Sequence, residues 1–106
     1  MAINYKNYLT TNITTATTVY NPTTAGIQAT VVSMILANNS NANTVTANVT
    51  LNNGSVTANV VRNVTIPVGT SLNVISSDRL IVAANNIMQV AATGSVDVTI
   101  SAIEVT

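Results

Sequence analysis

Apolar and polar residues alternate along most of the chain, which is the pattern of half-buried β-strands. In residues 44–52 the alternation has no fault, with Val45, Ala47, Val49 and Leu51 on one face and Thr and Asn on the other. Applied to the whole chain, this pattern predicts about eight strands. They cover residues 13–20, 27–37, 44–52, 55–66, 70–76, 79–83, 87–93 and 95–105.

Turn-forming residues separate the predicted strands. Asn53-Gly54 directly follows the strand over 44–52 and predicts a hairpin, because Asn and Gly accept the backbone angles of a tight turn. "NPTTAG" at 21–26 and "IPVG" at 66–69 predict two further turns, since proline lacks the N–H that a strand ladder needs. "NNSNAN" at 38–43 predicts a loop.

Two of the predicted strands change the face on which their apolar residues lie. The change falls between Val31 and Val32 in one strand, and between Ala102 and Ile103 in the last. The first change predicts a β-bulge or a strand shared by two sheets. In the strand after the hairpin, the inward positions are predicted to be Val56, Ala58, Val60, Val64 and Ile66.

Eight short antiparallel strands with regular turns predict an all-β fold, an eight-stranded β-sandwich that is jelly-roll-like, with an Ig-like sandwich as the alternative. At 106 residues the chain is one domain by length. Residues 13–106 are predicted to form the sandwich. Residues 1–12, which hold Tyr5 and Tyr8, are predicted to be an N-terminal arm that docks on a neighbour or a frayed or simple edge strand.

The composition indicates a surface that associates easily. Charged residues are 6% of the chain, against about a quarter in typical soluble domains. Thr, Asn, Val and Ala make up more than half of the residues, so Thr, Ser and Asn must cover most of the exterior. A nearly neutral exterior of this kind predicts a homo-oligomer or a component of a larger assembly.

Several classes of function are disfavoured. The cations are Lys6, Arg62 and Arg79 and the net charge is zero, which argues against nucleic-acid binding. The longest apolar runs, at 34–37 and 80–84, are too short to span a bilayer, and the N-terminus does not resemble a secretory signal. We therefore expect synthesis in the cytoplasm and no contact with a membrane.

The chain also offers little reactive chemistry. It has no His and no Cys, so the commonest general base, the thiol nucleophile and the favoured metal ligands are missing, and we expect no enzymatic activity and no cofactor. Asp78 is predicted to cap a turn at 76–79. Asp97 and Glu104 are predicted on opposite faces of the last strand, in structural roles. Arg62 is expected at the rim of the sandwich or paired with Asp97.

The order of turns and strands from residue 17 to residue 106 resembles a family of small β-sandwich proteins in the virions of tailed bacteriophages, marine phages especially. The chain departs from the family pattern at Asn85-Asn86, where Gly-Asp is frequent. The matching positions are Val19-Tyr20, Pro22, Asn63, Ile66-Pro67, Gly69, Ser71-Leu72, Leu80, Asp97-Val98 and Glu104.

This resemblance implies a structural role in a virion, with the major capsid protein or other virion proteins as partners. A capsid decoration or cement protein is the first interpretation, in which residues 1–12 bridge subunits and a trimer is one arrangement. A neck, tail or fibre component is the alternative, and a host-glycan-binding module acting through the 38–43 loop is a further one. The predicted interface residues are Tyr5, Lys6, Tyr8, Leu9 and Tyr20.

Overall fold

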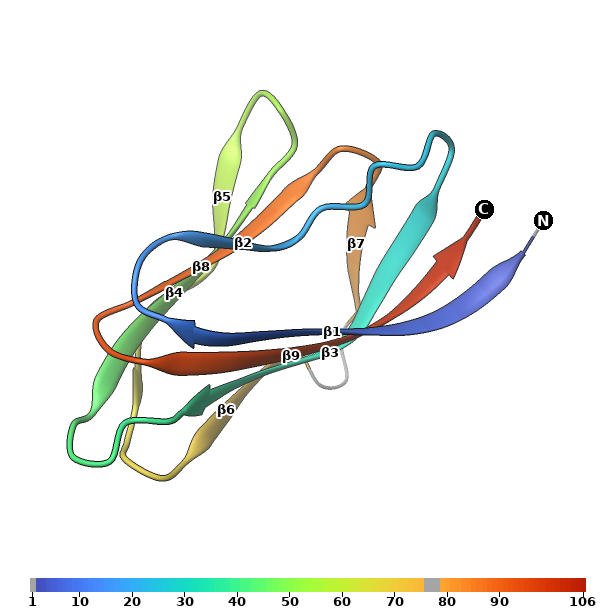
Figure 1. Cartoon of the computed structure of the whole chain (residues 1–106). Coiled ribbons are helices and arrows are strands. Elements are labelled where there is room, and N and C mark those ends of the chain that lie inside the picture. The colour runs from blue at the N-terminus through green and yellow to red at the C-terminus, as the bar shows by residue number, and fades with distance from the viewer. Residues whose placement is uncertain (1, 76–78) are drawn as a thin grey trace.

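The computed structural model of the chain describes residues 2–75 and 79–106, which form nine β-strands (Figure 1). Among these residues there is no helix, and hence none long and apolar enough to cross a bilayer. The strands are β1 Ile3–Ile13, β2 Thr17–Tyr20, β3 Gln28–Asn38, β4 Val45–Asn52, β5 Thr57–Ile66, β6 Ser71–Ile75, β7 Leu80–Ala83, β8 Ile87–Ala92 and β9 Val96–Val105.

The strands build two antiparallel sheets, which confirms the predicted sandwich. One sheet has the order β1-β9-β3-β6, with β7 also pairing with β3, and the other has the order β2-β8-β4-β5. The chain crosses between the sheets at most of its connections, but β4 and β5 form a hairpin within one sheet and β6 and β7 both belong to the other. The first and last strands, β1 and β9, lie side by side (Figure 1). This order is that of a jelly roll, in which β6 and β7 together occupy the place of one strand; it does not fit the Ig-like alternative.

The predicted first strand, over 13–20, is wrong. Ile13 is the last residue of β1, the chain turns over residues 14–16, and Thr17–Tyr20 form β2 in the opposite sheet. Ile13 and Val19 are both buried and six positions apart, so they fit one alternating pattern although they belong to different sheets. The structure therefore has nine strands in its described residues where the sequence predicts eight.

The hairpin at Asn53-Gly54 is confirmed, with β4 and β5 paired on either side of it. Asn53 accepts the N–H groups of Ser55 and Val56 through Oδ1, and Gly54 has a φ of 96°. These bonds hold a loop of residues 53–56, so β5 begins at Thr57 rather than at residue 55. The prediction that Val56 points inward is wrong, because its side chain is 63% exposed in the loop.

The β5 strand is irregular, and this changes its inward residues. Its register with β4 shifts twice, between Ala47 and Val49 and between Val49 and Thr50. Val61 lies opposite the buried Val49, and Val60 and Val61 both pack against the core. The first irregularity contains Asn63, whose φ is 53° and whose N–H donates a hydrogen bond to Oδ1 of Asn48.

The bulge predicted near Val32 is confirmed, while the second change of phase is not. The register of β3 with β9 shifts between Val31 and Ser33, which leaves Val32 as the extra residue. In β9 the buried positions alternate without interruption from Val96 to Glu104. The predicted change at Ala102–Ile103 is wrong because the inward position after Ala102 belongs to a carboxylate and not to an apolar residue.

The predicted turns at Pro22 and Pro67 are present. Thr70 donates its N–H to the Pro67 carbonyl, and Gly69 between them has a φ of 72°. Asn85 has a φ of 67° and donates its N–H to the Pro22 carbonyl. This position therefore needs a residue that tolerates left-handed geometry. The turn predicted around Asp78 lies outside the described residues.

Candidate functional site

The outward surface of the five-stranded sheet carries large apolar side chains. The strand register aligns Tyr5 of β1, Ile103 of β9, Thr30 of β3 and Ile81 of β7 in one row across the sheet. Tyr5 is 80% exposed and Ile81 is 70% exposed, so this surface is not covered by the rest of the chain. We call it the apolar face, and define it by Ile3, Tyr5, Leu9, Ile81, Ile103 and Val105.

A hollow lies on this face between β1 and β3. Tyr5, Val32 and Ile103 contribute to its walls, and its volume is about 410 Å³. It lies beside Val32, the extra residue of the β3 bulge. The hollow is large enough for an aromatic or branched side chain of a partner, and such apolar surface marks interaction sites in soluble proteins.

The outward surface of the four-stranded sheet is different in chemistry. Thr46 lies opposite Thr65, and Thr50 lies between Asn59 of β5 and Gln89 of β8. We call this surface the polar face, and define it by Thr46, Asn48, Thr50, Asn52, Thr57, Asn59, Thr65 and Gln89. The two outer faces of one sandwich thus differ. Large Ile, Leu and Tyr side chains lie among Thr, Ser and Asn on one side, whereas Thr, Asn and Gln dominate the other.

The five predicted interface residues do not share one environment. Tyr5, Lys6 and Leu9 are exposed on β1, an edge strand of the five-stranded sheet. Tyr8 is half-buried against the core, and Tyr20 is only 4% exposed. Tyr5 and Leu9 lie on the apolar face, whereas Tyr8 and Tyr20 meet inside the sandwich.

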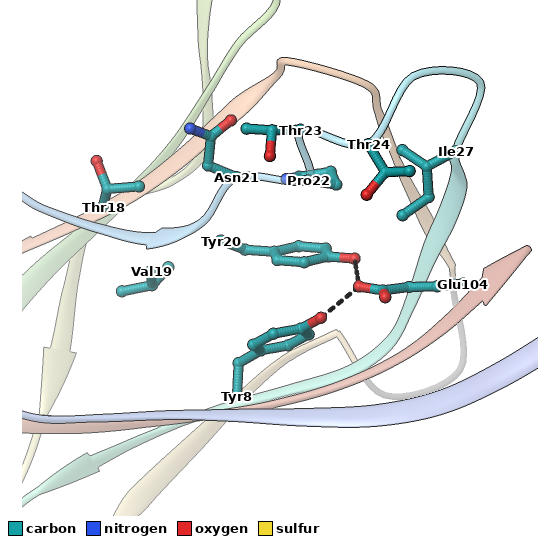
Figure 2. A pocket seen from close by; sticks show the side chains of 10 residues that line it. All are labelled: Tyr8, Thr18, Val19, Tyr20, Asn21, Pro22, Thr23, Thr24, Ile27 and Glu104. Atoms are coloured by element: carbon teal, nitrogen blue, oxygen red, sulfur yellow. Dashed lines mark hydrogen bonds between the residues drawn. The ribbon is translucent and has the colours of Figure 1, made fainter. Parts of the chain in front are cut away.

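A buried carboxylate joins these two tyrosines. Glu104 occupies an inward position of β9, is 8% exposed, and accepts a hydrogen bond of 2.5 Å from each of the Tyr8 and Tyr20 hydroxyls at Oε2 (Figure 2). The two rings lie 4.8 Å apart between centroids and are tilted by 34°. Tyr8 and Glu104 come from the five-stranded sheet and Tyr20 from the other, so this cluster ties the two sheets together.

The environment keeps both tyrosines protonated. Burial and the hydrogen bond to Glu104 raise the pKa of Tyr8 to about 12, and the same two causes raise the pKa of Tyr20 still further. Neutral hydroxyls are the donors that a buried carboxylate requires. The arrangement therefore acts as a structural clasp, and we call Tyr8, Tyr20 and Glu104 the tyrosine–glutamate clasp.

A pocket of about 350 Å³ opens beside the clasp. Its lining includes Asn21, Thr23 and Thr24 from the segment after β2, together with Glu104 of β9 (Figure 2). The polar groups of this pocket are hydrogen-bond donors and acceptors, and they would suit a hydroxyl-rich small ligand.

Sequence reasoning gave Glu104 a structural role but missed its environment. The signal was available in the spacing: Val96, Val98, Ile100 and Ala102 are inward, and the next position of the same phase is Glu104. A strict period of two places this carboxylate in the core, where it must have donors. Opposite faces for Asp97 and Glu104 are confirmed, since Glu104 is buried and Asp97 points outward.

Asp97 belongs to a second polar cluster, at the other end of β9. Its Oδ1 accepts the backbone N–H of Asn12 at 3.0 Å and the Asn39 side-chain amide at 2.8 Å. Arg62 is exposed beside the β5 bulge. Much of the polar capacity of the 38–43 loop is used internally, because Ser40 Oγ also accepts the N–H of Asn43.

Comparisons with protein-family models, with curated proteins and with solved structures find no match for this chain. The class of protein that the fold and its surfaces define is a jelly-roll β-sandwich with one apolar and one polar outer face.

Proposed function

We propose that this chain is a non-enzymatic structural protein of a bacteriophage virion, a decoration protein that attaches to the capsid exterior through its apolar face. The observation that carries the proposal is the difference between the two outer faces. A sandwich with one exposed apolar face and one Thr- and Asn-covered face is suited to lie between a protein surface and water.

The apolar face supports attachment by hydrophobic burial. Tyr5, Leu9 and Ile81 are each more than half exposed, and their burial against the major capsid protein removes apolar area from water. The hollow beside Val32 offers a place for a protruding side chain. Because the chain carries few charges, its attachment depends little on salt.

Many copies on one particle strengthen such attachment. A small face gives a weak individual contact, but copies that also contact one another convert later contacts into intramolecular ones. The sequence resemblance to phage β-sandwich proteins is the ground for choosing a virion over other assemblies. In the alternative, the chain is a component of the neck, tail or fibre, and its apolar face contacts a different virion protein.

Co-sedimentation of the purified chain with undecorated phage heads tests the proposal. We expect saturable binding, and we expect the triple variant Tyr5→Thr, Leu9→Thr, Ile81→Thr to lose it. The matched control is Thr46→Ser, Thr50→Ser on the polar face, which should bind as the natural chain does. Absence of saturable binding, or equal loss by both variants, would contradict attachment through the apolar face.

Glycan binding is the second candidate function, and the pocket beside the clasp favours it. Asn21, Thr23, Thr24 and the Glu104 carboxylate surround a volume that can hold one sugar ring. However, Tyr20 is 4% exposed and offers little ring surface for stacking. Two results together would make glycan binding the first candidate function. The chain would bind host polysaccharide but not phage heads, and the double variant Thr23→Ala, Thr24→Ala would lose the polysaccharide binding.

A further inference from the structure

The four edges of the two sheets are protected to different degrees. An exposed sheet edge presents unpaired N–H and C=O groups, and proteins commonly shorten, bend or charge such edges to prevent pairing with another chain. In the described residues β2 has four residues, and the edge of β6 and β7 is broken into pieces of five and four. Strand β5 is longer but has two register shifts and the exposed Arg62.

Strand β1 lacks most of these protections. It has eleven residues, and its register with β9 is continuous from Ile3 opposite Val105 to Thr10 opposite Val98. It contains no proline, and Lys6 is its single charge. The regular part of β1 is therefore the longest uninterrupted edge among the described strands.

The hydrogen-bond pattern shows which residues of β1 face this open edge. Ala2 and Thr106 exchange both backbone hydrogen bonds, at 3.0 and 2.9 Å. In an antiparallel pair such exchanging positions recur at every second residue, so the even-numbered residues of β1 bond to β9. The N–H and C=O groups of Tyr5, Asn7 and Leu9 consequently point away from β9, toward the open edge.

We propose that β1 pairs with β1 of a second copy of this chain, antiparallel, with Asn7 opposite Asn7 of the partner. In this register Tyr5 of each copy lies opposite Leu9 of the other. The backbones of these opposed residues exchange hydrogen bonds. The outward groups of the two strands then form about six inter-chain hydrogen bonds. The contact is isologous, as expected for a two-fold dimer.

The side chains select this register over its neighbour. With Asn7 at the centre, apolar Tyr5 meets apolar Leu9 on the outer face, and Lys6 lies opposite Tyr8. Centring the pair on Lys6 would place two ammonium groups directly opposite each other and would leave Tyr5 opposite Asn7. Directly opposed like charges destabilise a strand pair, whereas aromatic–aliphatic pairs stabilise it.

The pairing also extends the surface assigned to attachment. A two-fold axis perpendicular to an antiparallel sheet keeps corresponding side chains on the same side. The two five-stranded sheets become one continuous sheet, with Tyr5 and Leu9 of both copies at its centre. The dimer does not depend on a capsid, so it is tested with the chain alone.

The first experiment measures mass by sedimentation equilibrium over a range of concentrations. We expect twice the chain mass of 10.9 kDa at high concentration. Asn7→Pro removes an N–H that faces the open edge, and Pro is tolerated at such edge positions. It should raise the dimer dissociation constant by about 10- to 100-fold, whereas Asn7→Ala, which keeps the N–H, should leave the constant nearly unchanged.

A cysteine experiment fixes the register and covers the case in which Asn7→Pro fails to fold. The chain has no Cys, so each single substitution introduces one thiol. Hydrogen-bonded opposite residues have Cα atoms about 5.5 Å apart, within disulfide range, so Asn7→Cys should form a covalent dimer on mild oxidation. Lys6→Cys, diagonal to its own copy, should cross-link far less.

The outcomes separate clearly. A dimer that is weakened in Asn7→Pro and cross-linked in Asn7→Cys supports the proposal. A chain that stays monomeric at high concentration, a trimer without the Asn7 cross-link, or faster cross-linking through Lys6→Cys than through Asn7→Cys overturns it. A monomer that binds heads would keep the proposed function while assigning the open edge to another protein.

Discussion

The two sheets of the sandwich have the same antiparallel design but different exteriors. The five-stranded sheet presents Tyr5, Leu9 and Ile81 to solvent and ends at the regular edge of β1. The four-stranded sheet presents Thr and Asn and ends at the bulged edge of β5. The inner faces of both sheets are mainly apolar, so the difference does not come from the requirements of the core. This difference is the basis of our proposal that one sheet meets other chains and the other meets water.

Two close contacts lie at opposite ends of β9. At its end the tyrosine–glutamate clasp joins the two sheets through charge-assisted hydrogen bonds. Before its start, Gly94 in the turn after β8 packs against Val45 of β4, the strand that pairs with β8 in the four-stranded sheet. Each contact can be broken by one substitution.

Glu104→Ala should have the largest effect on stability. It removes two hydrogen bonds to a charged acceptor and leaves the buried Tyr20 hydroxyl without a partner, which we expect to lower the free energy of unfolding by about 3 kcal/mol or more. Glu104→Gln retains a carbonyl that both hydroxyls can reach, and should cost about 1 kcal/mol. Urea unfolding followed by circular dichroism measures the free energy of unfolding of both variants. Equal losses in the two variants would show that a hydrogen-bond acceptor at position 104 does not contribute to stability.

Gly94→Ala should have the next largest effect. A Cβ at this position would lie 2.5 Å from Cγ1 of Val45, closer than two carbon atoms can approach. Moving the turn or the valine should lower the free energy of unfolding by about 1 to 3 kcal/mol. Val45→Ala in the same chain removes the clashing methyl groups, so the double variant should lose less than the sum of the single variants. Strict additivity would show that the two residues do not interact.

Alkaline pH should weaken the clasp with a defined sign. The pKa of Tyr8 is about 12 in the folded chain and about 10 in the unfolded chain, and the pKa of Tyr20 is also raised. Between these values the folded chain binds more protons than the unfolded one, so stability falls as pH rises from 10 through 12. It should be independent of these groups below pH 10.

Urea midpoints measured between pH 8 and pH 11.5 test this dependence. The double variant Tyr8→Phe, Tyr20→Phe should be less stable at pH 8 but should lose less of its remaining stability across the interval. A natural chain whose midpoint does not fall above pH 10 would contradict the protonated clasp.

The local parts of the fold could be predicted from the sequence. The alternation in β4, the Asn53-Gly54 hairpin and the bulge at Val32 each depend on neighbouring residues, and all three are confirmed. The boundary between β1 and β2 could not be placed, because Ile13 and Val19 keep one phase while the chain changes sheets.

The clasp and the apolar face depend on pairings between distant segments. Glu104 is 96 residues from Tyr8 and 84 from Tyr20, and the local sequence does not specify either contact. Likewise, the row from Tyr5 to Ile81 exists only because β9 and β3 lie between their strands. Such features follow from the topology, which the strand pattern restricts to a few sandwiches without choosing among them.

Exchanging the chemistry of the two outer faces should change association while leaving stability almost unaltered. One double variant, Tyr5→Thr, Leu9→Thr, makes the outer face of the five-stranded sheet more polar. A second, Thr46→Ile, Thr50→Ile, makes the outer face of the four-stranded sheet more apolar. All four positions point outward, so each pair should change the free energy of unfolding by about 0.5 kcal/mol or less. Fluorescence of a hydrophobic dye should fall for the first variant and rise for the second. If both variants bound the dye as the natural chain does, the two sheets would differ in composition but not in their capacity to meet a partner.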